Sequence, residues 1–324
     1  MRSQAKTKRR PSGPKAKALF ARGLPKRLTV ADDDAKRADA ALATTLLKFE
    51  GDPAALHLLA ERADTWRTRE RGSVHEWAEA HRVISSGPVP GRWVSRPYQR
   101  PVLEAVTAKG VQGVLYVAAS QGGGKTEICL NVAGYHMDED PSAVLLVEPT
   151  LDMADAFSKD RLAPMIAACA PLRAKVKDPK ARDSGNTTRH KVYPGGHVTM
   201  VGANSASGLA MRPVRVVLFD EVDRYPLSAG SEGDPVKLAE TRTFAYDILG
   251  LARKLFVTSP GQKHGRSDKL WGKTDQQEYM VPCADCGQRQ VLKWSQVHWD
   301  KDAEGKHLPE TASYTCEGCG VIWS

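Results

Sequence analysis

The sequence predicts an α/β protein in which a mostly parallel sheet is flanked by helices. Short apolar runs rich in β-branched and aromatic residues are typical of strands, and here they alternate with stretches of helical pattern such as 151–169. That alternation is typical of a parallel sheet whose faces are covered by helices. The expected strands are 113–119, 143–149, 197–203, 214–219 and 254–261.

The expected strand at 113–119 runs into a glycine-rich segment, AASQGGGKTE. Gly124, Lys125 and Thr126 match the end of a phosphate loop (Walker A), in which backbone N–H groups surround the phosphates, the lysine reaches the β and γ oxygens, and the hydroxyl holds Mg²⁺. A flexible glycine loop is the alternative. The strand before the segment and the helical run after it favour a nucleoside triphosphate site.

This phosphate loop is a variant, because Ala119 replaces its usual opening glycine. Gly122 and Gly123 are expected to supply positive φ angles instead. The expected ATP-binding residues of the loop are Ser120, Gln121, Gly122, Gly123, Gly124, Lys125 and Thr126.

A second motif, VVLFDEVD, follows about 95 residues further on. Its apolar run is typical of a strand buried on both faces, and Asp220 would lie at the carboxyl end, where open α/β sheets bind ligands. Asp220 and Thr126 would then hold Mg²⁺, and Glu221 would deprotonate the attacking water. Solvated acids at a strand end are the alternative. Together with the phosphate loop, the motif predicts a P-loop NTPase with Lys125, Asp220 and Glu221 as catalytic residues.

Two further residue pairs are weaker candidates for the same site. Tyr98 and Gln99 precede the loop and suit an adenine contact, by stacking and by hydrogen bonds to the base edge. Thr258 and Ser259 end the last expected strand near the γ-phosphate, where they would sense hydrolysis. A simple Ser-Pro turn is the alternative for this second pair.

The formal net charge of +9 belongs to the N-terminal tail. Ten of the 47 Lys and Arg residues lie within residues 1–27, which contain no Asp or Glu, so the rest of the chain carries 37 basic and 38 acidic residues. We expect this tail to be disordered. Contact with DNA or RNA phosphates and a merely solubilising role are both open for it.

Two C-x₂-C pairs near the C-terminus predict a metal site. They are Cys283 with Cys286 and Cys316 with Cys319, separated by 29 residues and each followed by a glycine. Four thiolates so placed can hold a structural Zn²⁺ tetrahedrally, and the glycines allow the tight turns around it. Disulfides are the alternative, which an intracellular ATPase disfavours.

These observations divide the chain into four expected regions and predict no membrane segment. No run of 18 or more apolar residues occurs, and no apolar stretch follows the N-terminal charges, so neither a membrane span nor a secretory signal is expected. Within the second region, Ser73 and Glu76 predict a helix that begins with a capping box. The regions are a basic disordered tail at 1–28, a helical region at 29–86, a P-loop ATPase domain at 87–275 and a zinc-ribbon-like four-cysteine segment at 276–324.

Several sequence blocks, in order, resemble the GpA-type phage terminase large subunit. They include SVHEWAEAHRV, SQGGGKTE, VGANSASGLAMRPVRVVLFDEVDRYP and QQEYMVPCADCGQ, and the resemblance covers residues 73–324. It implies an ATP-driven motor that packages viral double-stranded DNA into a procapsid, and in which Thr258 and Ser259 couple hydrolysis to movement. The implied partners are that DNA, a terminase small subunit, the portal of the procapsid and further copies of the chain, in the cytoplasm of an infected or lysogenic bacterial host.

The chain also departs from the pattern of this family. Gln121 precedes three glycines, whereas family members commonly place a Gln one residue before the Gly-Lys pair, and Arg212 is only a candidate arginine finger. The sequence ends at Ser324, before any nuclease domain, so we expect ATP hydrolysis without DNA cleavage. A helicase-like DNA-dependent ATPase and a non-catalytic remnant that binds zinc and DNA are the rival interpretations.

Overall fold

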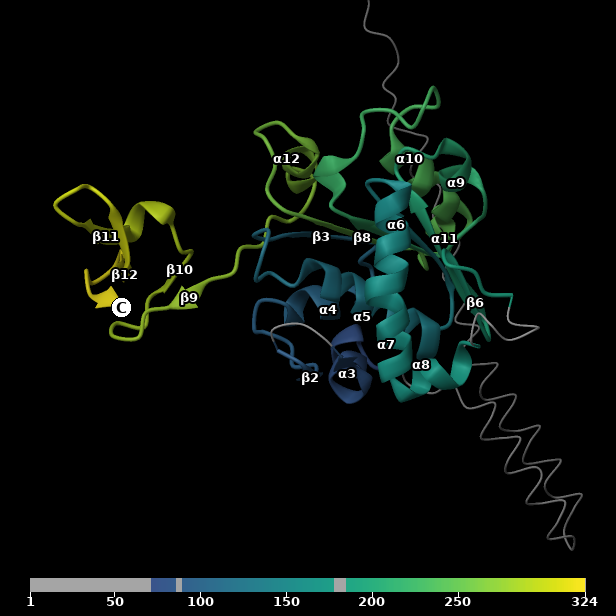
Figure 1. Ribbon diagram of the computed structural model, residues 1–324, viewed down its shortest axis with the longest axis horizontal. Helices are drawn as coiled ribbons and strands as arrows, with labels where there is room; N and C mark the ends of the chain where they lie inside the picture. The colour runs from purple at the N-terminus through teal and green to yellow at the C-terminus, as the bar shows by residue number, and fades with distance from the viewer. Residues whose placement is uncertain (1–70, 86–88, 178–184, 324) are drawn as a thin grey trace, which may run out of the picture. The chain divides into compact units, whose positions relative to one another are not determined.

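The computed structural model describes residues 71–85, 89–177 and 185–323. Its central element is a six-stranded sheet (Figure 1). The strand order is β3-β8-β7-β4-β6-β5, and all neighbours are parallel except β5 and β6. The strands are β3 (Gly113–Val117), β4 (Ala143–Glu148), β5 (His190–Tyr193), β6 (Gly196–Gly202), β7 (Val216–Asp220) and β8 (Arg253–Thr258).

The predicted α/β class and the five predicted strands are therefore confirmed. The sequence did not predict β5. This strand is short, and its residues alternate between buried and more exposed positions because it is the antiparallel edge of the sheet. Such a strand lacks the continuous apolar run that identifies the central strands.

Helices cover both faces of the sheet. Val144 and Leu146 of β4 join one apolar cluster, while Leu145 and Val147 join another, since successive side chains of a strand point to opposite faces. The helices packed in the first cluster are α3 (Val74–His81), α4 (Arg100–Thr107), α5 (Lys125–Asp138), α6 (Leu151–Phe157), α7 (Ala163–Ala168) and α8 (Ala170–Lys175). Those in the second are α9 (Ala206–Ala210), α10 (Pro235–Glu240) and α12 (Arg266–Trp271). Figure 1 shows α4 and α5 below β3 and β8, with α10 and α12 above.

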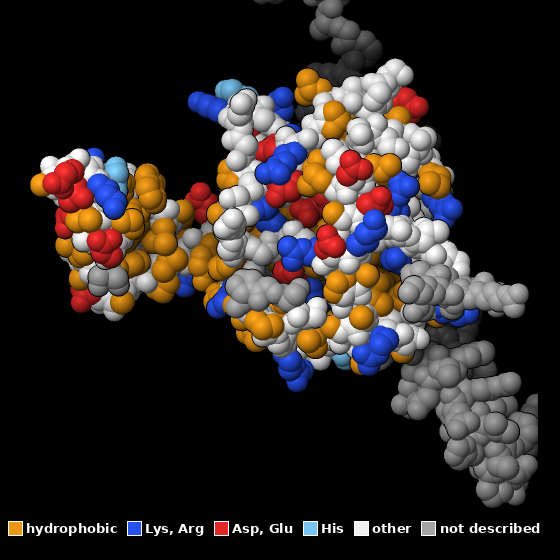
Figure 2. All heavy atoms as spheres, in the orientation of Figure 1, with side chains coloured by type: hydrophobic (Ala, Val, Ile, Leu, Met, Phe, Trp, Pro, Cys, Tyr) orange, Lys and Arg blue, Asp and Glu red, His pale blue; other side chains and the backbone are white. Residues whose placement is uncertain are grey.

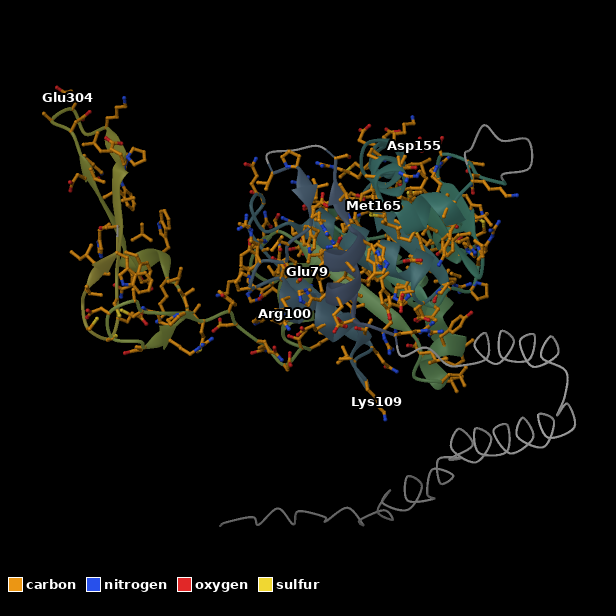
Figure 3. All side chains as sticks on the ribbon, turned by 90° about the horizontal axis from the view of Figure 1, so that it is seen from below. Glu79, Arg100, Lys109, Asp155, Met165 and Glu304 are labelled. Carbon is orange, nitrogen blue, oxygen red and sulfur yellow. The ribbon has the colours of Figure 1, made fainter. Side chains whose placement is uncertain are left out.

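Two further helical features connect these layers. A π-helical turn, Ser158–Leu162, joins α6 to α7, so the predicted helical stretch 151–169 is a run of consecutive helical segments. Met165 of α7, labelled in Figure 3, is only 1% exposed in the first cluster. The short helix α11 (Phe244–Ile248) has no buried residue.

The described part of the N-terminal region contains the predicted capped helix. The Ser73 side chain accepts a hydrogen bond from the Glu76 backbone, and the Glu76 side chain binds the backbone of Ser73 in return, which confirms the capping box. The predicted basic tail and most of the predicted helical region lie outside the described residues. A two-stranded ribbon follows α3, formed by β1 (Val83–Ile84) and β2 (Gly91–Arg92).

Past α12, the C-terminal segment consists of short strands. A hairpin of β9 (Val281–Pro282) and β10 (Arg289–Gln290) contains the first cysteine pair, and a small antiparallel sheet contains the second. The strands of that sheet are β11 (Val297–Lys301), β12 (His307–Thr315) and β13 (Ile322–Trp323). Within the described residues, no helix combines the length and the apolar character that crossing a membrane requires.

Charged side chains are mixed on the surface. Figure 2 shows Lys and Arg interspersed with Asp and Glu across the visible face of the helix-covered sheet. This mixture agrees with the nearly equal numbers of basic and acidic residues after the N-terminal tail.

Trp77 fixes α3 against α5. Its indole N–H donates to Asp138 Oδ2 at 2.7 Å, and its ring lies so close to Gly134 that an added Cβ would come within 2.2 Å of it. The contact thus depends on a glycine in the middle of α5.

We predict that Gly134→Ala destabilises the protein. Alanine favours a helix over glycine by about 1 kcal/mol. Because the added Cβ would lie only 2.2 Å from the Trp77 ring, overpacking should cost about 2–3 kcal/mol, the upper part of its usual range, so the free energy of unfolding should fall by about 1–2 kcal/mol. Urea unfolding measures the change. Gly272→Ala is the control, because its Cβ would meet no atom closer than 3.8 Å. An unchanged stability of Gly134→Ala would contradict the packing described here.

Candidate active site and four-cysteine centre

The sheet order brings the predicted catalytic segments together. Strand β8 lies between β3, which leads into the phosphate loop, and β7, which ends at Asp220. All three run parallel, so their carboxyl ends share one edge of the sheet. Residues from three distant parts of the sequence therefore meet at that edge.

Three glycines shape the phosphate loop, for two different reasons. Gly122 and Gly124 have φ angles of 83° and 69°, which residues with a Cβ rarely adopt. Gly123 has no positive φ, contrary to the expectation from the sequence, but a Cβ there would lie 2.6 Å from the Ala118 side chain. Gly123 is needed because the backbone passes close to Ala118. Ser120 and Gln121 are exposed on the same loop.

Three side chains hold this loop by its carbonyl groups. Tyr98 donates its hydroxyl to the Gly122 oxygen at 3.0 Å, while Gln99 Nε2 and the Tyr116 hydroxyl donate to the Gly123 oxygen at 3.2 and 2.8 Å. Gln99 Oε1 accepts from the backbone N–H of Arg96. Tyr98 and Gln99 thus support the loop here, and their adenine contact stays a prediction.

The residues predicted to bind phosphate and magnesium lie next to one another. The Thr126 hydroxyl is 3.4 Å from Asp220 Oδ2, and Lys125 Nζ is 3.9 Å from Glu221 Oε1. Lys125 also donates to the Ala119 carbonyl at 2.7 Å. A hydroxyl and a carboxylate side by side are oxygen ligands of the kind that Mg²⁺ prefers, so these two residues fit the ion.

Glu221 has an unusual backbone conformation. Its φ of 51° lies in the left-handed region, which costs a residue with a Cβ about 1–3 kcal/mol and tends to be retained at functional sites. Its side chain also lies 3.5 Å from Arg224 Nε. The strained turn directs Glu221 away from the path of β7 and towards the two cations, Lys125 and Arg224.

Glu148 is a third carboxyl group that the sequence analysis missed. The register of β4 and β7 pairs Val147 with Phe219, so Glu148 and Asp220 are next to one another where the two strands end. Glu148 is 3% exposed, and its Oε1 has no hydrogen-bond partner among the described residues. The sequence signal for Glu148 was an acid directly after an apolar run, which is the same signal that identified Asp220.

Burial raises the pKa of both Glu148 and Asp220. Desolvation, with the charges of Asp220 and Glu221 adding to it, raises the pKa of Glu148 to about 9. Desolvation and the neighbouring Glu221 likewise raise the pKa of Asp220 to about 6, against the opposing effects of Lys125 and Thr126. The site therefore concentrates carboxyl groups that a bound cation would stabilise in their charged form.

The predicted coupling residues lie between the two halves of the site. Thr258, fully buried at the end of β8, donates its hydroxyl to the Ser259 carbonyl, and the Ser259 hydroxyl is buried without a partner among the described residues. The Thr258 backbone oxygen accepts from the backbone N–H of Ala118, at the end of β3. Their coupling role stays a prediction.

The segment after Ser259 is fastened to the acidic turn. Asp223 accepts hydrogen bonds from the Ser267 backbone and hydroxyl. Arg266 donates to the Val222 and Tyr225 carbonyls at 3.1 and 3.2 Å. The start of α12 is thereby held directly to the residues that follow Glu221, a contact that the sequence did not predict.

Arg212 lies elsewhere. It is exposed. Burial lowers the pKa of His190 and His197, on β5 and β6, and the charge of Arg212 adds a smaller effect in the same direction. Those strands are at the opposite end of the sheet from β3. Arg212 is therefore not placed to act as an arginine finger on the phosphate loop of its own chain.

The four predicted metal-binding cysteines form a cluster. The Sγ atoms of Cys283, Cys286, Cys316 and Cys319 all lie within 4.8 Å of one another. Cys283 is 3.8 Å from Cys319, and Cys286 is 3.9 Å from Cys316. These separations are far longer than the S–S bond of a disulfide, about 2.0 Å. They match the edge of a tetrahedron with Zn–S bonds of about 2.3 Å, which is roughly 3.8 Å.

Local backbone geometry supports the same cluster. Gly287 and Gly320 have φ angles of 71° and 73°. Each donates its backbone N–H to the backbone oxygen of the first cysteine of its pair, at 3.0 Å. Hydrogen bonds from the backbone, that of Cys319 first, lower the pKa of Cys316 to about 6. The two glycine turns direct the four sulfur atoms towards one point, as the donor set of a zinc site requires.

With this geometry in place, the family can be identified. A family model described as phage terminase large subunit gpA, ATPase domain, matches residues 87–324. The chain belongs to this terminase family. The match includes the phosphate loop, the acidic turn and the four cysteines.

Two curated terminase large subunits are similar to most of this chain. That of Enterobacteria phage P21 is 24% identical over 260 residues, which cover 76% of this chain and 39% of the relative. That of Escherichia phage lambda is 24% identical over 255 residues, which cover 75% and 38%. The chain therefore spans less than half the length of these relatives.

Solved terminase structures are similar to part of the chain. The HK97 bacteriophage large terminase has a TM-score of 0.49 at 13% identity, covering 61% of this chain and 40% of that one. The ATPase domain of the Thermus phage P74-26 large terminase has a TM-score of 0.41 at 16% identity, covering 61% and 78%.

We predict that Glu148 makes the nucleotide-free protein less stable as the pH rises. Because folding raises its pKa from 4.5 to about 9, the folded state holds a proton that the unfolded state releases. The stabilising contribution is complete below about pH 4.5 and is lost as the pH rises towards about 9. Glu148→Gln cannot titrate, so its melting temperature should exceed that of the wild type at about pH 8 and approach it at about pH 4.

Thermal unfolding at both pH values measures this difference. Glu310→Gln, at an exposed position of β12, is the control and should follow the wild type at each pH. If Glu148→Gln and the wild type keep the same pH dependence, Glu148 is not the buried, protonated group described here.

Proposed function

We propose that this chain is the ATP-hydrolysing motor part of a phage terminase large subunit. The proximity of the Thr126 hydroxyl and Asp220, 3.4 Å apart, is the observation that carries the proposal, because it joins the phosphate loop and the acidic turn into one metal–nucleotide site. Membership of the terminase ATPase family supports it.

Each side chain of the site would have a distinct role in ATP hydrolysis. Lys125 would leave the Ala119 carbonyl and Glu221 to bind the β and γ phosphates, while Thr126 and Asp220 would hold the Mg²⁺ ion that neutralises phosphate charge. Glu221 would then accept a proton from the attacking water. Arg224, next to Glu221, is placed to keep the carboxylate oriented.

Movement would pass from the site through two routes. Thr258 and Ser259 lie at the end of β8, between the phosphate loop and the acidic turn. The contacts of Asp223 and Arg266 fasten α12 to that turn, so a change at Glu221 would reach α12 directly. Double-stranded viral DNA is the substrate that we propose for this movement, with ATP and Mg²⁺ as cofactors.

The same proposal includes the partners of this motor and its location in the cell. A terminase small subunit, the portal of a procapsid and further copies of this chain would be its partners, in the cytoplasm of the bacterial host. The four cysteines would hold a structural Zn²⁺, since all four ligands are thiols and no position is left for a substrate.

Replacing Glu221 tests the enzymatic proposal. Glu221→Gln should lower DNA-stimulated ATP hydrolysis by about 100-fold or more, because removal of a general base costs about that factor, and should keep nucleotide affinity. Lys125→Ala should lose nucleotide affinity itself. Phosphate release and binding of a fluorescent ATP analogue measure the two effects.

A matched control separates chemistry from folding in this test. Glu232→Gln changes an exposed glutamate and should hydrolyse ATP like the wild type. Hydrolysis indifferent to Glu221, or no hydrolysis by the wild type with DNA present, would refute the motor proposal. Unwinding of a forked duplex would indicate a helicase instead.

Metal analysis tests the zinc proposal. We expect one zinc per chain after purification, and a large loss of zinc in Cys286→Ser with a lower melting temperature of the C-terminal segment. Cys169→Ala removes a buried thiol outside the cluster and should keep the zinc. A zinc-free wild type that melts no lower after chelation would exclude a structural metal here.

A further inference from the structure

A cavity of about 440 Å³ opens at the opposite edge of the sheet from the phosphate loop. It is lined by Arg215, which precedes β7, by Arg253, which begins β8, and by Tyr135 and His136 near the end of α5. Lys125 starts this 14-residue helix, whose length is about 20 Å. The cavity is therefore a separate place from the candidate active site.

Three guanidinium groups line this cavity against two carboxylates. Both carboxylates already accept hydrogen bonds from arginine side chains. Asp140 accepts from Arg71 and, at 2.9 and 2.7 Å, from both terminal nitrogens of Arg215. Glu104 accepts from Arg100 at 2.8 Å. Positive charge consequently remains in the lining, and Arg253 is the group with no acidic hydrogen-bond partner among the described residues.

Arg253 is held in position rather than neutralised. Its Nη1 donates to the Gly250 and Ala252 carbonyls at 3.1 and 2.7 Å. Burial lowers its pKa, and the charge of Arg215 acts in the same direction. A guanidinium stays protonated regardless, so the uncompensated charge favours an anion in the cavity. The C-terminal end of α5 opposes an anion, but with only about half a unit of negative charge.

We propose that this cavity is a second phosphate-binding site. The charged oxygens of a phosphate group match the guanidinium groups of Arg253 and Arg71, since guanidinium forks bind phosphate in pairs of hydrogen bonds. A free phosphate and a DNA phosphodiester offer the same charged oxygens, and titration with each of them distinguishes the two sources.

Titration calorimetry with inorganic phosphate tests the site. The Lys125→Ala protein is the parent, because it removes phosphate binding by the loop and makes the result independent of ATP hydrolysis. Arg253→Gln and Arg71→Ala, each made in this parent, should weaken phosphate binding by about tenfold or more, a loss of one or two charge-assisted hydrogen bonds.

Lys109→Gln is the matched control. Lys109 is an exposed cation directly after Ala108 of the lining and two residues after the end of α4, and Figure 3 shows it pointing outward. This variant should bind phosphate within about twofold of the parent. Thermal unfolding of each variant establishes that it is folded, and Arg71→Ala covers the case in which Arg253→Gln is not, because Arg71 is half exposed.

A short DNA duplex, titrated into the same proteins, identifies the source of the phosphate. If duplex affinity falls in Arg253→Gln and Arg71→Ala while free phosphate does not bind, the phosphate group is recognised but belongs to DNA. If neither free phosphate nor the duplex depends on the two arginines, or if a carboxylate such as acetate binds as well as phosphate, the proposed site is overturned.

Discussion

The insertion of β8 between β3 and β7 is the constraint on which the candidate active site depends. Parallel pairing on both sides of β8 aligns the carboxyl ends of the three strands side by side. The phosphate loop, Thr258 and Asp220 therefore meet at one edge of the sheet. Only with that alignment does the hydroxyl of Thr126, in the first turn of α5, reach to 3.4 Å from a carboxylate 94 residues away.

Desolvation is the second physical feature of this site. Asp220 and Glu148 are almost fully buried, and Lys125 is a buried cation near them. Burying several acids is unfavourable unless cations or protons compensate them, and a Mg²⁺ ion with its nucleotide would supply that compensation from outside. The strain at Glu221 is a further local cost, of a kind that functional sites tolerate because surrounding contacts hold the residue in place. Here those contacts come from Arg224, Asp223 and Arg266.

The two ends of α5 show two different ways of preparing a site for anions. At its start, glycines with positive φ and a helix N-terminus supply backbone N–H groups, and three side chains hold the loop in shape. At its end, the negative end of the helix dipole disfavours an anion, and guanidinium groups from separate parts of the chain outweigh it. The groups suited to a phosphate thus come from the backbone at one end of α5 and from side chains at the other.

Sequence alone determined the features encoded in contiguous residues. Apolar runs identified the central strands because burial on both faces requires them, and GGGKT, FDE and the C-x₂-C pairs identified reactive groups because their chemistry depends on close spacing. The resemblance to terminases came from the order of such blocks. The edge strand β5, which is half exposed, escaped prediction, and Gly123 proved necessary for close packing against Ala118 instead of for a positive φ.

Tertiary structure decided which distant residues meet. The strand order, which no local pattern specifies, placed β8 beside the phosphate loop and Arg212 at the other end of the sheet. Register brought Glu148 next to Asp220, and packing turned Tyr98 and Gln99 towards loop carbonyls and gathered three arginines around one cavity. These outcomes depend on contacts between residues far apart in the chain, and the free energy of such contacts cannot be read from local composition.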